Sequence, residues 1–245
     1  MPFADINKFT TFNDFHNAAQ GGLHSKHDDV HIFRFADLNK TVVKHMPLFR
    51  TSFYQIGLMR KADFSMSVFE HEYRLENQFA LILFKPGQLI QFKSDPKWEG
   101  YVILFKDSLL TIRQENEAAL KRFAVLDPTK DSFIIVDEEN FDDLSEVYEK
   151  MLYEYEKPLQ NSVPIIELYL HVLFHKVNHL YEKLRTQEPI FSTRKASVTF
   201  QFKNLVNQKL RETKTIADYA DMLHVTPKYL IEALKETSHI APRTL

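Results

Sequence analysis

The sequence predicts an α+β protein in which short β-strands come first and helices follow. Short apolar or alternating segments separated by turns fill residues 1–137, which is typical of a sandwich or barrel. Two long segments with apolar residues at three- and four-residue steps come next, and they indicate a helical hairpin over 138–185. A polar linker is expected over 186–197, and the pattern of 198–245 is helical.

The expected strands are recognised by alternation or by β-branched and aromatic content. Phe79–Phe84 is continuously apolar, as in a strand buried on both faces. Lys85-Pro86-Gly87-Gln88 then forms a turn. The other expected strands are Val30–Phe35, Phe53–Met59, Phe64–Phe69, Leu89–Phe92, Tyr101–Phe105 and Phe133–Val136. A helix is expected over Asp107–Phe123.

Two apolar stripes define the hairpin. The first runs from Phe141 to Tyr155 and stops before Pro158. The second runs from Ile165 to Leu184, with Pro164 in its first turn. Such a hairpin can pack on the β-structure, pair with a second subunit, or do both.

Composition excludes several kinds of site. The 245 residues include no Cys, which excludes disulfides, thiolate metal sites, iron–sulfur clusters and cysteine nucleophiles. The segment Met1–Phe15 lacks the apolar core of a signal peptide. No apolar run approaches the roughly 18 residues that a membrane span requires. We therefore expect a cytoplasmic protein that does not act at a membrane.

Charge is unevenly distributed along the chain. The net charge is −2, but residues 192–245 carry nine Lys or Arg against five Asp or Glu, so the rest of the chain is acidic. A basic end on an acidic body is typical of a DNA-binding segment.

The segment Thr215–Glu236 has the pattern of a helix-turn-helix. Thr215 with Asp218 three residues later indicates a capping box for a helix over Ile216–Leu223. Thr226-Pro227 then supplies an N-cap and a first helical residue for a second helix. Its inward stripe is expected to be Tyr229, Leu230, Ala233 and Leu234.

These residues resemble the first helix-turn-helix of AraC/XylS-type bacterial transcription regulators. The resemblance lies in Ile216–Ala220, Thr226–Leu230 and Ala233-Leu234-Lys235. Upstream, Phe79–Leu110 is similar to the later part of that family's cupin-type sensor domain. The resemblance implies a cupin-like β-barrel that binds a small effector, a hairpin that makes a homodimer, and sequence-specific DNA binding.

The family's DNA-binding domain contains two helix-turn-helix units, and this chain ends at Leu245 after the first. His239 stands where the family usually has Gly, and the tail Ser238–Leu245 differs from the family pattern. The resemblance therefore describes a regulator truncated within its DNA-binding domain, 198–245.

The outward face of the second helix supplies the candidate DNA-binding residues. Lys228 and Lys235 suit phosphate or guanine, Glu232 suits cytosine N4, and Ile231 suits a thymine methyl group. The full candidate set is Thr226, Lys228, Ile231, Glu232 and Lys235.

The sequence gives weaker signals for ligand and metal sites than for the helix-turn-helix. Arg50 and Arg60 are candidates for an anionic effector, with a surface role as the alternative. Pro47–Tyr54, where metal cupins carry a His pair, has no His. Two other clusters have ligand spacing, His171/His175/His179 and His24/His27/His31. The first is better explained by partly buried boundary residues beside the apolar stripe of its helix, and the second is explained as well by a polar loop that enters a strand. We expect no metal, no cofactor and no catalytic residues.

Three functions remain open on this basis. The first is a DNA-binding transcription regulator controlled by a small ligand. The second is a ligand-binding dimer that has lost DNA binding. The third is a metal cupin enzyme, against which the missing His pair argues.

Overall fold

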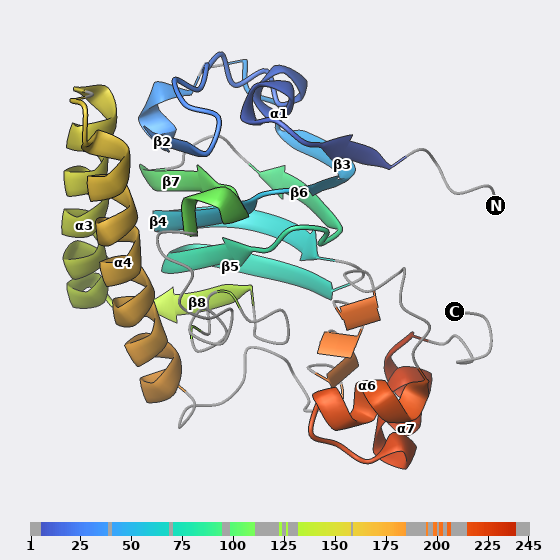
Figure 1. Cartoon of the computed structure of the whole chain (residues 1–245). Coiled ribbons are helices and arrows are strands. Elements are labelled where there is room, and N and C mark those ends of the chain that lie inside the picture. The colour runs from blue at the N-terminus through green and yellow to red at the C-terminus, as the bar shows by residue number, and fades with distance from the viewer. Residues whose placement is uncertain are drawn as a thin grey trace.

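The computed structural model combines a curved β-sheet, a helical hairpin and a small C-terminal helical unit (Figure 1). No helix within the described part of the chain is both long and apolar enough to span a bilayer. The structure describes residues 6–38, 41–68, 71–94, 99–110, 123, 126, 132–157, 159–184, 195, 198–199, 201–202, 205–206 and 215–238.

One mixed sheet contains the eight described strands. Its main path is β1-β3-β6-β4-β5-β8, and β7 joins β4 to β2. Only the β1–β3 pair is parallel among the pairings of these strands. The strands are β1 (Asn7–Phe9), β2 (Val30–Arg34), β3 (His45–Thr51), β4 (Tyr54–Val68), β5 (His71–Phe84), β6 (Ile90–Ser94), β7 (Glu99–Phe105) and β8 (Phe133–Val136).

The expectation of a β-barrel was wrong, although the α+β class is confirmed. Pairing among the described strands does not close, and β1, β2 and β8 end its branches. The reason lies in β4, where two separate strands were expected. Its first half, Tyr54–Arg60, pairs with β7, and its second half, Phe64–Val68, pairs with β6. Register shifts around Ala62 separate the halves, so the sheet bends and branches at β4 without its edges meeting.

Five α-helices and two short 3₁₀ helices have both of their bounds within the described residues. They are α1 (Phe12–Ala18), α3 (Glu138–Glu156), α4 (Ser162–Leu184), α6 (Ile216–Met222), α7 (Pro227–Ser238), η1 (Phe35–Asp37) and η2 (Asp107–Leu110). The two expected helices form as α3 and α4, and Asp137 caps α3 by accepting a bond from the Asn140 N–H at 2.8 Å. The expected stripe of α4 is only partly buried, because its members Leu168 and Val172 are exposed. The buried face of α4 includes Ile166, Leu170 and Phe174 instead. Beyond η2, most of the helix expected over Asp107–Phe123 lies outside the described residues.

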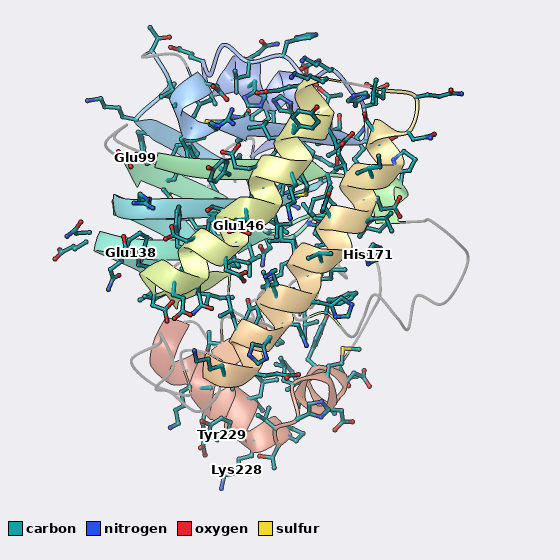
Figure 2. The ribbon with its side chains drawn as sticks, turned by 90° about the vertical axis from the view of Figure 1, so that its left-hand side faces the viewer. Glu99, Glu138, Glu146, His171, Lys228 and Tyr229 are labelled. Carbon is teal, nitrogen blue, oxygen red and sulfur yellow. The ribbon has the colours of Figure 1, made fainter. Side chains whose placement is uncertain are left out.

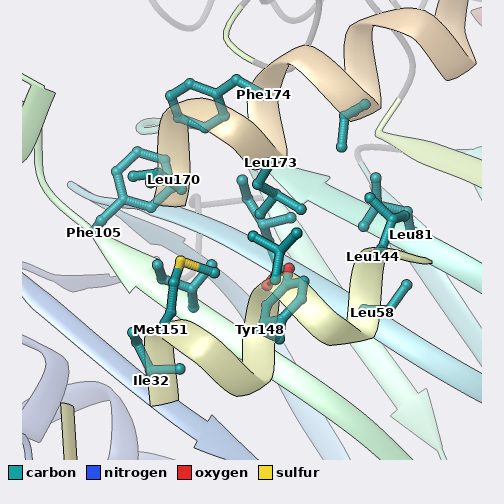
Figure 3. Close-up of a cluster of buried hydrophobic side chains, with 14 of the residues drawn as sticks. Ile32, Leu58, Leu81, Phe105, Leu144, Tyr148, Met151, Leu170, Leu173 and Phe174 are labelled. Atoms are coloured by element: carbon teal, nitrogen blue, oxygen red, sulfur yellow. Dashed lines mark hydrogen bonds between the residues drawn. The ribbon is translucent and has the colours of Figure 1, made fainter. Parts of the chain in front are cut away.

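The sheet buries both of its faces, which explains the continuous apolar run in β5. Leu81 and Leu83 face the core shared with α3 and α4, whereas Ile82 and Phe84 face a second core that includes α1. Figure 3 shows the first core, in which Tyr148 of α3 is fully buried. Its hydroxyl donates to the Ile56 carbonyl at 3.1 Å, so α3 is fixed to the first half of β4.

Candidate functional site

The two C-terminal helices α6 and α7 form a capped pair. The Thr215 Oγ1 accepts from the Asp218 N–H at 3.3 Å, and the Asp218 carboxylate accepts from the Thr215 N–H at 2.7 Å. His224 turns the chain with a φ of 53°, in the left-handed region. The Thr226 Oγ1 then accepts from the Tyr229 N–H at 3.1 Å. Both helix starts are therefore stabilised by their own side chains.

The faces of α7 follow the expected division. Leu230, Ala233 and Leu234 are buried in a cluster with Ala220 of α6, and Tyr229 packs against its edge. Four of the five candidate DNA-binding side chains are exposed, and Ile231 is half-buried; the exposed ones are Thr226, Lys228, Glu232 and Lys235. Lys228 points away from the helix pair (Figure 2). Contact with DNA remains a prediction.

A cavity of about 110 Å³ lies in the second core, between α1 and the sheet. Almost all of its wall is apolar. The lining side chains include Phe15 and His16 of α1, Phe33 of β2, Phe49 of β3, Gln55, Met59 and Met66 of β4, Ile82 and Phe84 of β5, Phe92 of β6 and Val102 of β7. Neither Arg50 nor Arg60 is among the lining residues.

His16 is the ionisable side chain in the cavity wall. Its side chain is 2% exposed, and its Nε2 is buried without a hydrogen-bond partner in the structure. Burial, and next the nearby His24, lower the pKa of His16 to about 4, so its imidazole is neutral at pH 7. The other polar lining residue, Gln55, donates from Nε2 to the Thr51 Oγ1 at 3.3 Å.

His16 also contacts a buried polar cluster that reaches α3. Its ring meets the His31 ring edge-on, with centroids 4.9 Å apart. The His31 Nδ1 lies 2.7 Å from the Tyr155 hydroxyl oxygen, which also accepts from the Lys26 N–H at 2.9 Å. Burial, followed by the charges of His16, His24 and Lys26, lowers the pKa of His31 to about 3. The end of α3 is thus tied to the neighbourhood of the cavity.

The two candidate arginines lie elsewhere. Arg60 bridges β4 to the start of α3, with its guanidinium 3.0 Å from the Asp142 carboxylate and 4.9 Å from the Phe141 ring centroid. These contacts hold Arg60 against α3, and its role in effector binding stays a prediction. Arg50 lines a separate open pocket together with Lys8, Lys85 and Asp107.

The two histidine clusters occupy different surroundings. Along α4, the His171 and His175 rings both contact the Phe123 ring, with centroids 6.2 Å and 4.8 Å away. In the other cluster, His31 is buried against Tyr155, whereas His24 is exposed beside Asn13. Among the described residues, no group of three or more His, Asp or Glu side chains is arranged to hold a metal ion.

The sequence did contain a signal for α1, which was not predicted. Thr11 accepts from the Asp14 N–H at 3.1 Å as the N-cap. Phe12, Phe15 and Ala19 follow at steps of three and four residues and are buried. That pattern also places His16 beside the buried face, and so it identifies His16 as a candidate.

Comparisons with known proteins give only distant similarity. No protein-family model and no curated protein match the chain. The solved structures that are similar to it include ToxT from Vibrio cholerae, and ToxT of Vibrio cholerae strain SCE256 with a bound unsaturated fatty acid. Both are 13% identical to this chain; the alignments cover 88% and 90% of it and 78% of each ToxT chain, with TM-scores of 0.34 and 0.35. Similarity at this level assigns neither a family nor a ligand to the chain.

Proposed function

We propose that the protein is a DNA-binding transcription regulator whose affinity for DNA is controlled by a small molecule in the cavity of the second core. The observation that carries the proposal is α7, which presents a self-capped first turn and an exposed face with two lysines beside a glutamate. A helix of this kind fits the major groove with its N-terminal residues toward the bases.

Lys228→Ala is expected to weaken binding to DNA from upstream of the protein's own gene. Loss of one phosphate or guanine contact weakens affinity by about fivefold to a hundredfold, and loss of a phosphate contact lowers the salt slope by about one. The measurement is a titration over a salt series. Lys150→Ala on α3, which is also exposed, is the matched control and should bind like the unmodified chain.

The variant Glu232→Ala distinguishes recognition of a DNA base from general electrostatic attraction to DNA. A carboxylate that accepts from cytosine specifies a base pair, so its removal is expected to relax sequence preference with little effect on the salt slope. If the unmodified chain binds only weakly, and equally well to random DNA, the alternative function holds: a ligand-binding dimer without DNA recognition.

We infer that the second copy in a homodimer binds the outer face of α4. Leu168 and Val172 are one turn apart and are 63% and 43% exposed, although both are large apolar side chains. Contiguous exposed apolar residues on a helix are typical of an interaction surface. The apolar positions on the opposite face of α4, such as Leu170 and Phe174, are buried in the first core.

Leu168→Glu is therefore expected to convert the dimer to a monomer, because it buries a charge in the interface. Light scattering coupled to size exclusion at micromolar concentration measures the mass directly. Leu159→Glu is the control, since Leu159 is 75% exposed but precedes α4. A Leu168→Glu chain that keeps the dimer mass would contradict this interface.

A further inference from the structure

We propose that His16 determines the ligand specificity of the cavity, which takes a neutral molecule with an apolar body and one hydrogen-bonding group, such as a phenol or an alcohol. The inference rests on the proposed function, because it assumes that the cavity is the effector site. It adds the chemical class of the effector and the residue that recognises it.

The size of the cavity limits the apolar body. A dry cavity of about 150 Å³ is known to hold benzene, and this cavity measures about 110 Å³. Met59 and Met66 form part of its wall. Methionine side chains adapt their shape readily, so a single aromatic ring or a short alkyl body fits with small adjustments of the wall.

The hydrogen-bonding group follows from the surroundings of His16. Its ring lies among the rings of Phe15, Phe33 and His31, at centroid distances of 5.7, 5.1 and 4.9 Å. Gly21 closes the Nδ1 side, where a Cβ would lie only 3.1 Å from that nitrogen. His16 is among the residues that line the cavity, and its Nε2 is buried without a hydrogen-bond partner and with almost no surface open to the cavity. An unpaired buried polar atom is unfavourable, and a ligand hydroxyl or carbonyl would pair it once the His16 ring or its neighbours shift to admit the ligand.

We expect a neutral ligand because the described lining residues of the cavity carry no charge that could pair with an ionised one. The described residues that line the cavity include no Lys, Arg, Asp or Glu. An ionised carboxylate or amine would therefore lose its hydration without gaining a counter-charge. His16 itself is neutral at pH 7 because burial lowers its pKa. A neutral group loses less hydration, and a single hydrogen bond to Nε2 compensates for it.

Three probes built on one aromatic ring test the inference on the full chain at pH 7.5. Toluene has the apolar body alone, phenol replaces the methyl group with a hydroxyl, and benzoate carries an ionised carboxylate. Dissociation constants are measured by calorimetry for the unmodified chain and for His16→Phe. We expect His16→Phe to weaken the binding of phenol, relative to that of toluene, by about fivefold to a hundredfold, because the phenol hydroxyl loses its hydrogen-bond partner. Benzoate should bind the unmodified chain more weakly than phenol.

The comparison with toluene distinguishes the possible failures. A phenol-to-toluene ratio that changes by less than twofold in His16→Phe overturns the role of His16, while toluene binding still supports the cavity as a ligand site. Benzoate binding more tightly than phenol overturns the neutral class. Failure of all three probes to bind overturns the cavity as effector site and this inference with it. His16→Gln keeps a hydrogen-bonding group and should retain part of the phenol preference, which guards against a general packing defect in His16→Phe.

Discussion

Gly100→Ala is expected to destabilise the N-terminal β-structure by more than about 3 kcal/mol, enough to unfold it or make it insoluble. Gly100 has a φ of 124°, and an added Cβ would lie 1.9 Å from the Leu58 carbonyl oxygen. Leu58 and Gly100 both lie in the β4–β7 pairing, where Met59 is the partner of Gly100. Neither strand can move without disturbing the centre of the sheet. Urea unfolding followed by circular dichroism measures the loss.

Gly87→Ala is the matched control for this prediction. Gly87 also has a positive φ, of 84°, but nothing lies within 4 Å of its added Cβ. Only the left-handed conformation opposes the substitution, which costs about 1–2 kcal/mol. A Gly100→Ala chain as stable as Gly87→Ala would show that β4 and β7 do not approach each other in the described register.

Local patterns were sufficient to predict α3, α4, α6 and α7, but not to predict the sheet. The stripes of α3 and α4 repeat over about four turns or more, so both helices could be predicted, as could the caps of α6 and α7. Pairing between strands depends on residues far apart in the chain. Nothing near Ala62 indicates that β4 continues through it with register shifts and changes its partner from β7 to β6. The closed barrel was therefore expected where an open, branched sheet is found.

The candidate sites show the same contrast. The exposed face of α7 is a property of one helix and could be deduced from its inward stripe. The cavity is assembled from α1 and six strands, and no local pattern brings these together. His31 illustrates the difference, because its partner Tyr155 is 124 residues away. In the sequence, His31 follows a polar segment, and that local pattern does not distinguish it from a surface histidine.

Mild acid is expected to destabilise the second core through His16 and His31. Both side chains are buried, and burial is the main cause that lowers their pKa values, to about 4 and about 3. His24 and Lys26, which act on the pair, oppose further positive charge. Tyr155 places its hydroxyl against His31, and the His27 ring contacts the ring of Tyr155. Within these described surroundings, no carboxylate stabilises a protonated form of either ring.

The direction of this change in stability with pH follows because a histidine in the unfolded chain has its ordinary pKa of 6.5. Above pH 6.5 both states are neutral and the two histidines add no pH dependence. As the pH falls below 6.5 the unfolded chain binds protons that the folded chain does not. The stability therefore decreases until the pH reaches the pKa values of the two histidines in the folded chain. At pH 5 each histidine accounts for a loss of about 2 kcal/mol, which together is a large share of a typical domain stability of about 5–15 kcal/mol.

Urea unfolding at pH 7.5, 6.0 and 5.0 measures this loss, and two variants assign it. His16→Phe should decrease the slope of stability against pH between 4.5 and 6 by about 1.4 kcal/mol per unit, the value for one proton. His179→Asn is the control, because His179 is exposed on α4 and should leave the slope unchanged. An unmodified chain equally stable at pH 5.0 and 7.5 would mean that His16 and His31 gain protons without opening the core. Burial would then not keep the two imidazoles neutral. Between pH 7.5 and 5.0 His16 would lose the neutral form on which phenol recognition depends.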